Sequence, residues 1–116
     1  MLVAALIGWS VMQTQAAAAP RPTPPTYAEA LRCSGLTQAA SELEGGESDE
    51  GQALYDAALY WSLTTIQSGQ AARRPTATVE AEMTRSRVQA VRELTARNEA
   101  ALTALRACRA RTPSLG

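Results

Sequence analysis

The sequence contains no histidine, no lysine and no phenylalanine, and it has two cysteines among 116 residues. The absence of histidine removes the usual acid or base near neutral pH and the commonest nitrogen ligand of metals. Without histidine or lysine, no ready base exists to activate a serine, threonine or cysteine nucleophile. The sequence also lacks a phosphate-binding loop and a dinucleotide fingerprint. These absences predict a protein that is not an enzyme and that uses no cofactor or metal.

Neither positive nor negative charge is in excess, because 11 arginines balance 11 acidic residues. A chain with no net charge has no general attraction to nucleic acid or to anionic membranes. The acids gather between residues 42 and 56, whereas arginines are frequent after residue 76. We therefore expect these arginines to pair with the chain's own acids, and we expect no nucleic-acid partner.

The longest apolar run is short and lies at the N-terminus. Residues 2–12 (LVAALIGWSVM) are uncharged, but crossing a bilayer takes about 20 apolar residues. Ala16-x-Ala18 then fits the small-residue rule for signal peptidase. Residues 1–18 are thus predicted to be a cleaved signal peptide, although no basic residue precedes the run; the alternative is a frayed N-terminal helix. The expected location is the periplasm or the medium, with no stable membrane insertion after cleavage.

Export makes the cysteine count informative. Cys33 and Cys108 form the even pair that an exported domain uses for one disulfide. Such a bond closes a loop of about 75 residues, for which chain entropy predicts a stabilisation of about 4 to 5 kcal/mol. The alternative is a pair of buried free thiols in a cytosolic protein. Two cysteines this far apart, in a chain without histidine, do not make a zinc site.

Residues 19–25 are predicted to be an extended proline-rich spacer, and residues 26–116 a single helical domain. Thr26 begins the first helix, because Thr26-x-x-Glu29 is a capping box in which the threonine side chain accepts a hydrogen bond from the glutamate amide. The helical pattern continues to about Leu43. A glycine-rich linker at residues 45–51 then ends it.

The second predicted helix, at about residues 49–68, carries most of the apolar residues of the mature chain. They cover more than half of its circumference, so we expect this helix to be covered on more than one side or to sit at a partner interface. The candidate partner-binding residues lie here: Tyr55, Tyr60, Trp61 and Ile66.

The stretch from residue 76 to 111 reads as one long helix in an all-α fold. A seam of three- and four-residue steps runs along it, at Val88, Val91, Thr95, Asn98, Leu102, Leu105 and Cys108. At 1.5 Å per residue the two cysteines reach the same height if the first two helices lie end to end, antiparallel to the long one. The alternative is a break near Arg97-Asn98 that gives a four-helix bundle. We favour the unbroken helix, because no glycine or proline interrupts the stretch.

These features predict a small exported helical protein that acts by protein–protein binding or as a structural component, through an unknown partner or by self-association. One alternative is a periplasmic acid-stress chaperone. The chain is similar to small helical chaperones of that kind in size, export and single disulfide, without a shared motif. Acid sensing would then use the carboxylates at residues 42–56, which titrate near pH 4. Another alternative is an inhibitor or immunity protein for an exported enzyme.

Overall fold

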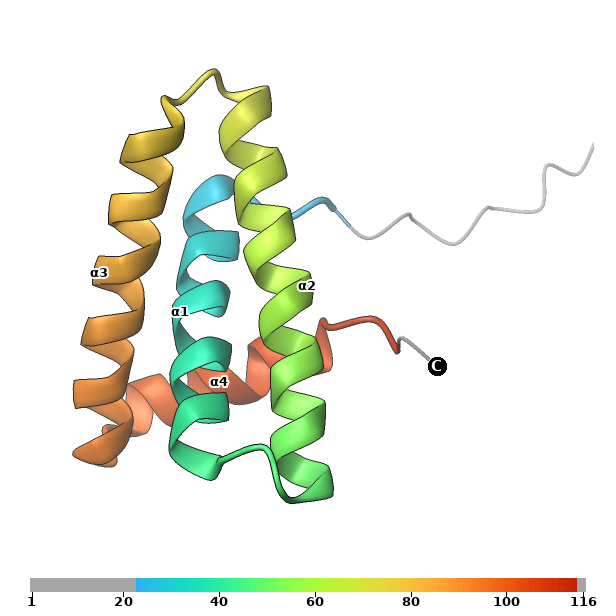
Figure 1. The fold of residues 1–116 in the computed structure, drawn as a ribbon, viewed down its shortest axis with the longest axis vertical. Helices are drawn as coiled ribbons and strands as arrows, with labels where there is room; N and C mark the ends of the chain where they lie inside the picture. The colour runs from blue at the N-terminus through green and yellow to red at the C-terminus, as the bar shows by residue number, and fades with distance from the viewer. Residues whose placement is uncertain (1–22, 115–116) are drawn as a thin grey trace, which may run out of the picture.

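The computed structural model describes residues 23–114, and within them it contains four α-helices and no strand. The helices are α1 (Tyr27–Glu44), α2 (Asp49–Ala71), α3 (Thr76–Thr95) and α4 (Glu99–Ala110). The first three run side by side, with α2 antiparallel to α1 and α3, and α4 lies across α1 near the end where α3 finishes (Figure 1). The predicted all-α class is confirmed. The proposed signal peptide, residues 1–18, lies outside the described residues.

The continuous helix over residues 76–111 is wrong, and the alternative break near Arg97-Asn98 is confirmed. The amides of Arg97 and Asn98 bond back to the carbonyls of Leu94 and Glu93, which is the Schellman pattern that ends helices. Arg97 takes the left-handed conformation of that motif, with φ 54°. Asn98 then caps α4, since its Oδ1 accepts a hydrogen bond from the Ala101 amide at 3.0 Å. Asn98, a polar residue of the predicted seam, is therefore the N-cap of a separate helix.

The linker between the first two helices reverses the chain, so α1 and α2 form an antiparallel pair and do not lie end to end. Gly45 adopts φ 83°, which favours glycine. Ser48 caps α2 by accepting a hydrogen bond from the Gly51 amide at 3.0 Å. At the start of α1 the expected cap is present, with Thr26 accepting from the Glu29 amide at 3.1 Å. In this antiparallel pair, α1 packs continuously against one face of α2.

The core is built around α1, which contacts all three other helices. It contains mostly small residues, together with one leucine and one tryptophan: Ala30, Cys33, Leu36, Ala39, Trp61, Ala90, Ala101 and Cys108. Gly35 permits the closest helix approach, because a Cβ there would lie 2.7 Å from the backbone carbonyl of Ser86 on α3. The Ser86 hydroxyl donates to the Leu31 carbonyl at 2.9 Å beside this contact.

The predicted disulfide between Cys33 and Cys108 is present, with a Cα–Cα distance of 5.4 Å. It joins the second turn of the central helix α1 to the last turn of α4. Because α4 turns across α1, the two cysteines meet without the end-to-end arrangement that the continuous helix required (Figure 1). None of the helices in residues 23–114 combines the length and the apolar character needed to cross a bilayer.

Salt bridges between arginine and glutamate join the helices around this core. Arg87 pairs with Glu42, and Arg109 pairs with Glu50, which confirms for these two arginines the expected pairing with the acids at residues 42–56. Two more pairs link α1 to the later helices: Arg32–Glu93 at 2.7 Å and Arg111–Glu29 at 2.7 Å. Glu93 pairs with Arg32 of α1 and not with Arg97, four residues further on, because Arg97 lies beyond the end of α3.

Candidate functional site

The four candidate partner-binding residues separate into two groups. Trp61 is 1% exposed and belongs to the core. Its indole Nε1 donates a hydrogen bond to Thr112 Oγ1 at 2.9 Å, just after α4. Tyr60 is half-buried and meets the Trp61 ring edge-on, with 5.0 Å between ring centroids. Trp61 is therefore part of the attachment of α4 and is not available to a partner.

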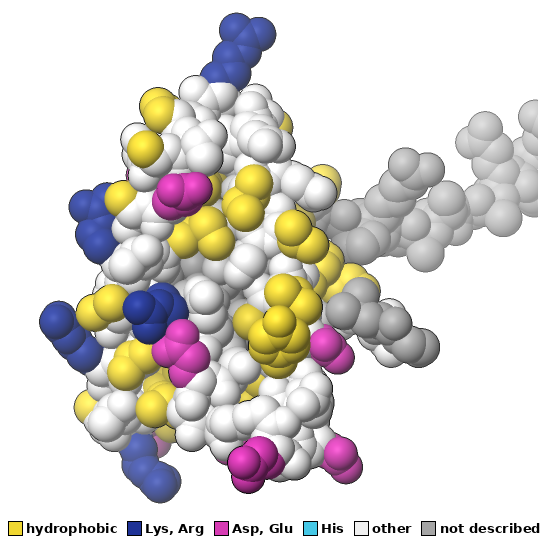
Figure 2. Space-filling model, viewed as in Figure 1, with side chains coloured by type: hydrophobic (Ala, Val, Ile, Leu, Met, Phe, Trp, Pro, Cys, Tyr) yellow, Lys and Arg dark blue, Asp and Glu magenta, His cyan; other side chains and the backbone are white. Residues whose placement is uncertain are grey.

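Tyr55 and Ile66 lie on the surface, with exposed fractions of 54% and 39%. Two leucines of the same helix join them, Leu59 at 45% and Leu63 at 58%. Side chains four or eleven residues apart on an α-helix point in nearly the same direction, so these four form one row about 16 Å long. We call this row (Tyr55, Leu59, Leu63 and Ile66) the α2 stripe. The face of the molecule that contains α2 shows hydrophobic side chains gathered along that helix (Figure 2).

Sequence reasoning did not select Leu59 and Leu63, although a signal for them exists. The buried residues of α2 recur on one face at Leu54, Ala57, Ala58, Trp61 and Thr65. The remaining large apolar residues of the helix follow their own three- and four-residue spacing on a second face. Two apolar faces on one helix exceed what a single core can cover.

Ile66 also borders a shallow groove between α2 and α3. The groove is lined by Gln38 of α1, Ile66 of α2 and four residues of α3: Glu80, Met83, Thr84 and Arg87. Half-buried Met83 adds apolar surface next to the stripe. Met83 therefore extends the apolar surface of the stripe from α2 to α3, among polar residues of the groove.

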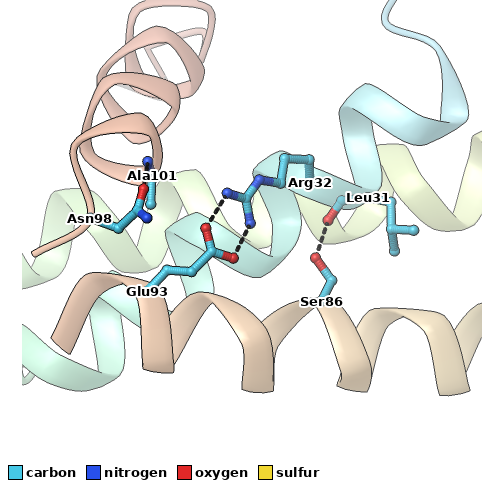
Figure 3. Close-up of polar contacts among 6 residues, drawn as sticks. All are labelled: Leu31, Arg32, Ser86, Glu93, Asn98 and Ala101. Carbon is cyan, nitrogen blue, oxygen red and sulfur yellow. Dashed lines mark hydrogen bonds and ion pairs between the residues drawn. The ribbon is translucent and has the colours of Figure 1, made fainter. Parts of the chain in front are cut away.

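Several ionisable groups of the described region join helices. Arg32 and Glu93 form a two-bond contact at 3.1 and 2.7 Å (Figure 3), and these bonds hold the pKa of the Glu93 carboxyl below its usual value. Hydrogen bonds from Arg111 and Thr26 lower the pKa of Glu29 in the same way. A hydrogen bond from Arg109 lowers that of Glu50. Each of these carboxylates therefore stays ionised and bound to its arginine near neutral pH.

The Tyr27 hydroxyl has a pKa above its usual value. Burial raises the pKa of its hydroxyl, and so does the hydrogen bond that this hydroxyl donates to Glu82 Oε2 at 3.0 Å. The Arg74 guanidinium lies 4.1 Å from the ring centroid. The hydroxyl thus stays protonated and serves as a hydrogen-bond donor between α1 and α3, with an arginine packed on the ring.

Both cysteines lie in the disulfide, and no cluster of three or more histidine, cysteine or acidic side chains in residues 23–114 is arranged to hold a metal ion. When the chain is compared with known proteins, no family model, no curated protein and no solved structure matches it. Four of the six large apolar side chains that are exposed in residues 23–114 lie in the α2 stripe.

Proposed function

We propose that the chain is a small exported helical protein that acts by binding another protein chain through the α2 stripe, and that it performs no reaction. The observation that carries the proposal is the exposure of four large apolar side chains in one row on α2. A row of anchors at three- and four-residue spacing suits a partner that presents an apolar helical face. The partner class is thus an apolar helix of a protein.

The scaffold behind the stripe supports this function. The opposite side of α2 is fixed by the buried Trp61, and the hydroxyl contact between Ser34 and Ser62 at 3.2 Å joins α2 to α1. The stripe therefore projects from a helix whose orientation is set by the core. A rigid helical face loses little conformational freedom on binding, which favours affinity.

Export is supported by the disulfide, since such bonds persist in oxidising compartments, and by the leader-like pattern of residues 1–18. Intact-mass measurement and N-terminal sequencing of the protein from whole cells test it. We expect a mature start near Ala19. A chain that keeps Met1 would contradict export.

Binding through the stripe is tested by placing a photo-crosslinking amino acid at Leu63 in the native host. Val88 is a matched control, because it is also exposed, at 37%, but lies on α3 opposite the buried Val79 and Ala90. We expect a discrete protein adduct from position 63 and none from position 88. The adduct should disappear when Leu59→Asp is added. No adduct from position 63, or equal adducts from both positions, would contradict the proposal.

A second candidate function is an acid-opened chaperone, favoured by the arginine–glutamate pairs that join the helices. Protonation of the glutamates would remove these links and loosen the helices from one another. This function predicts that apolar dye binding rises when the pH falls below about 4, as side-chain packing is lost. Unchanged dye binding and an unchanged near-UV spectrum at low pH would exclude it.

A further inference from the structure

Building on that proposed function, we propose that the partner of the α2 stripe is a second copy of this chain, bound by an antiparallel contact between the two α2 helices. The proposal identifies the occupant of the stripe. It is carried by the position of the stripe on α2 and by the charges at the two ends of that helix.

The stripe is centred on its helix. It runs from Tyr55 to Ile66, and α2 runs over Asp49–Ala71, so the two midpoints lie within one residue of each other. Two copies related by a twofold axis through that midpoint would place Tyr55 of one against Ile66 of the other, and the two leucines around the axis. A twofold interface needs this kind of self-complementary patch. Binding of a different protein would not require the stripe to be centred on α2.

The ends of α2 have opposite charges. Glu47, Asp49 and Glu50 lie at its N-terminal end, and Arg73 and Arg74 follow its C-terminal end. An antiparallel contact brings the acidic end of each helix to the arginine end of the other. A parallel contact would bring like charges together. Complementarity of this kind fixes the orientation of an interface more than it adds affinity.

The charges best placed for this contact are free of other ion pairs. Within residues 23–114, neither Glu47 nor Arg73 forms a salt bridge, and both are exposed. Glu50 is held by Arg109, and Arg74 lies over the Tyr27 ring. Glu47 and Arg73 are also placed almost symmetrically about the midpoint of the stripe. They are therefore expected to face each other across the two copies, once at each end.

A contact of one helix pair is small beside the roughly 1,600 Å² that a standard stable interface buries. Met83 and the groove beside Ile66 extend it only modestly. We therefore expect a weak dimer that forms in the micromolar range and exchanges with monomer.

The first test is sedimentation equilibrium of the purified, disulfide-bonded protein from about 1 to about 500 μM. We expect a monomer–dimer equilibrium for the wild type. Leu59→Asp should raise the dimer Kd by about 10-fold or more, because it buries charge near the twofold axis. Val88→Asp adds the same charge off the stripe and should leave Kd unchanged. Circular dichroism melting checks that both variants fold.

Two outcomes of this test overturn the inference. A wild type that stays monomeric over the whole range shows that the partner is a different chain; the crosslinking at Leu63 then still tests the proposed function by itself. A dimer that Leu59→Asp leaves intact shows that the copies meet elsewhere. A dimer sensitive to Leu59→Asp alone supports the stripe as the interface.

Orientation is tested with Glu47→Arg and Arg73→Glu, each made alone. In an antiparallel dimer each variant places like charges at both ends, and its Kd should rise by about 3- to 10-fold. An equimolar mixture of the two variants restores opposite charges at both ends, so heterodimers should form with the wild-type Kd. In a parallel dimer each variant alone would bind like the wild type, and that result overturns the antiparallel arrangement.

Discussion

The central helix α1 and the last helix α4 touch each other and share the disulfide, yet they are held in different ways. α1 is surrounded by α2, α3 and α4, and it buries eight residues. α4 lies across one side of α1, and its buried residues are Ala101 and Cys108. One helix is fixed by buried contacts along its length, and the other by two buried residues and by polar attachments near its C-terminal end.

Those attachments are specific. Thr112 accepts a hydrogen bond from the Trp61 indole and donates one to the Cys108 carbonyl at 2.8 Å. Arg111 pairs with Glu29, and its guanidinium lies 5.7 Å from the Trp61 ring. The comparison indicates that α1 is required for the whole fold, whereas α4 is held by few buried residues and by a tether near its C-terminal end. Local opening is expected to start in α4, because few buried apolar contacts oppose it.

Removing the tether has the largest expected effect. Cys33→Ala together with Cys108→Ala should lower the free energy of unfolding by about 4 kcal/mol, since the bond closes a loop with a sequence separation of 75 residues. Denaturant melts measure this loss. Hydrogen exchange should show α4 amides losing protection far more than α1 amides. Equal loss in both helices would contradict the view of α4 as a tethered helix, and reduction of the wild type provides the matched control.

Gly35→Ala tests the central helix, and its effect should be smaller. The new Cβ would meet the Ser86 backbone at 2.7 Å, so α3 must move away from α1. Overpacking of this kind should cost about 2 to 3 kcal/mol of unfolding free energy. Gly46→Ala is the control, because Gln52 Nε2, at 3.9 Å, is the nearest atom its Cβ would meet. A Gly35→Ala protein as stable as the control would show that the two backbones are not in contact.

Acid should loosen the arginine–glutamate links, including both that hold α4. Glu29, Glu50 and Glu93 each have a pKa lowered by hydrogen bonds from arginine. A carboxyl whose folded pKa lies below its unfolded value adds stability above that unfolded pKa, near 4.5. The added stability is lost as the pH falls through the folded pKa. We therefore expect Tm to be level above about pH 5 and to fall below about pH 4.

The glutamate pairs at α4 can be separated from the rest of this acid response. Glu29→Gln and Glu50→Gln remove titrating groups that bind α4, and together they should flatten the fall in Tm at low pH. Glu44→Gln provides a control with an exposed glutamate of α1 outside these salt bridges, and it should leave the pH profile as in the wild type. An unaltered profile in the double variant would show that the α4 pairs do not contribute.

Several features of this fold were predictable from local sequence. Thr26-x-x-Glu29 gave the start of α1, because a cap depends on residues within one turn. The cysteine pair predicted the bond between α1 and α4, and the separation of acids from arginines predicted the salt bridges of Glu42 and Glu50. Each of these follows from chemistry that does not depend on how the helices are arranged.

The arrangement of the helices and the site depended on long-range contacts that periodicity does not reveal. Apolar residues cover most of α2, so the sequence could not say which face meets α1; Trp61 is buried and Leu63 is exposed on the same helix. The linker at residues 45–48 is equally compatible with an extended or a reversed path. Its reversal follows from the burial that α2 gains along α1, which is a property of the whole molecule.

The end of α3 was the hardest feature to predict from the sequence. Arg97 occupies the left-handed position after the helix, where glycine is usual. Arg97→Gly tests it directly. Left-handed backbone strains a residue with a Cβ but not glycine, so we expect the free energy of unfolding to rise by about 0.5 to 1 kcal/mol. Arg85→Gly is the control: in the middle of α3 it should cost about 1 kcal/mol, as glycine does in a helix interior.

Opposite signs for these two substitutions would establish that the backbone turns at Arg97 in solution, and chemical denaturation resolves differences of this size when the two variants share one m-value. A loss at both positions would instead mean that α3 and α4 form one continuous helix. With α1 and α2 paired side by side, as they are here, a continuous helix would carry Cys108 away from Cys33. The same protein should then fail to form the disulfide, which thiol titration of the Arg97→Gly protein reports independently.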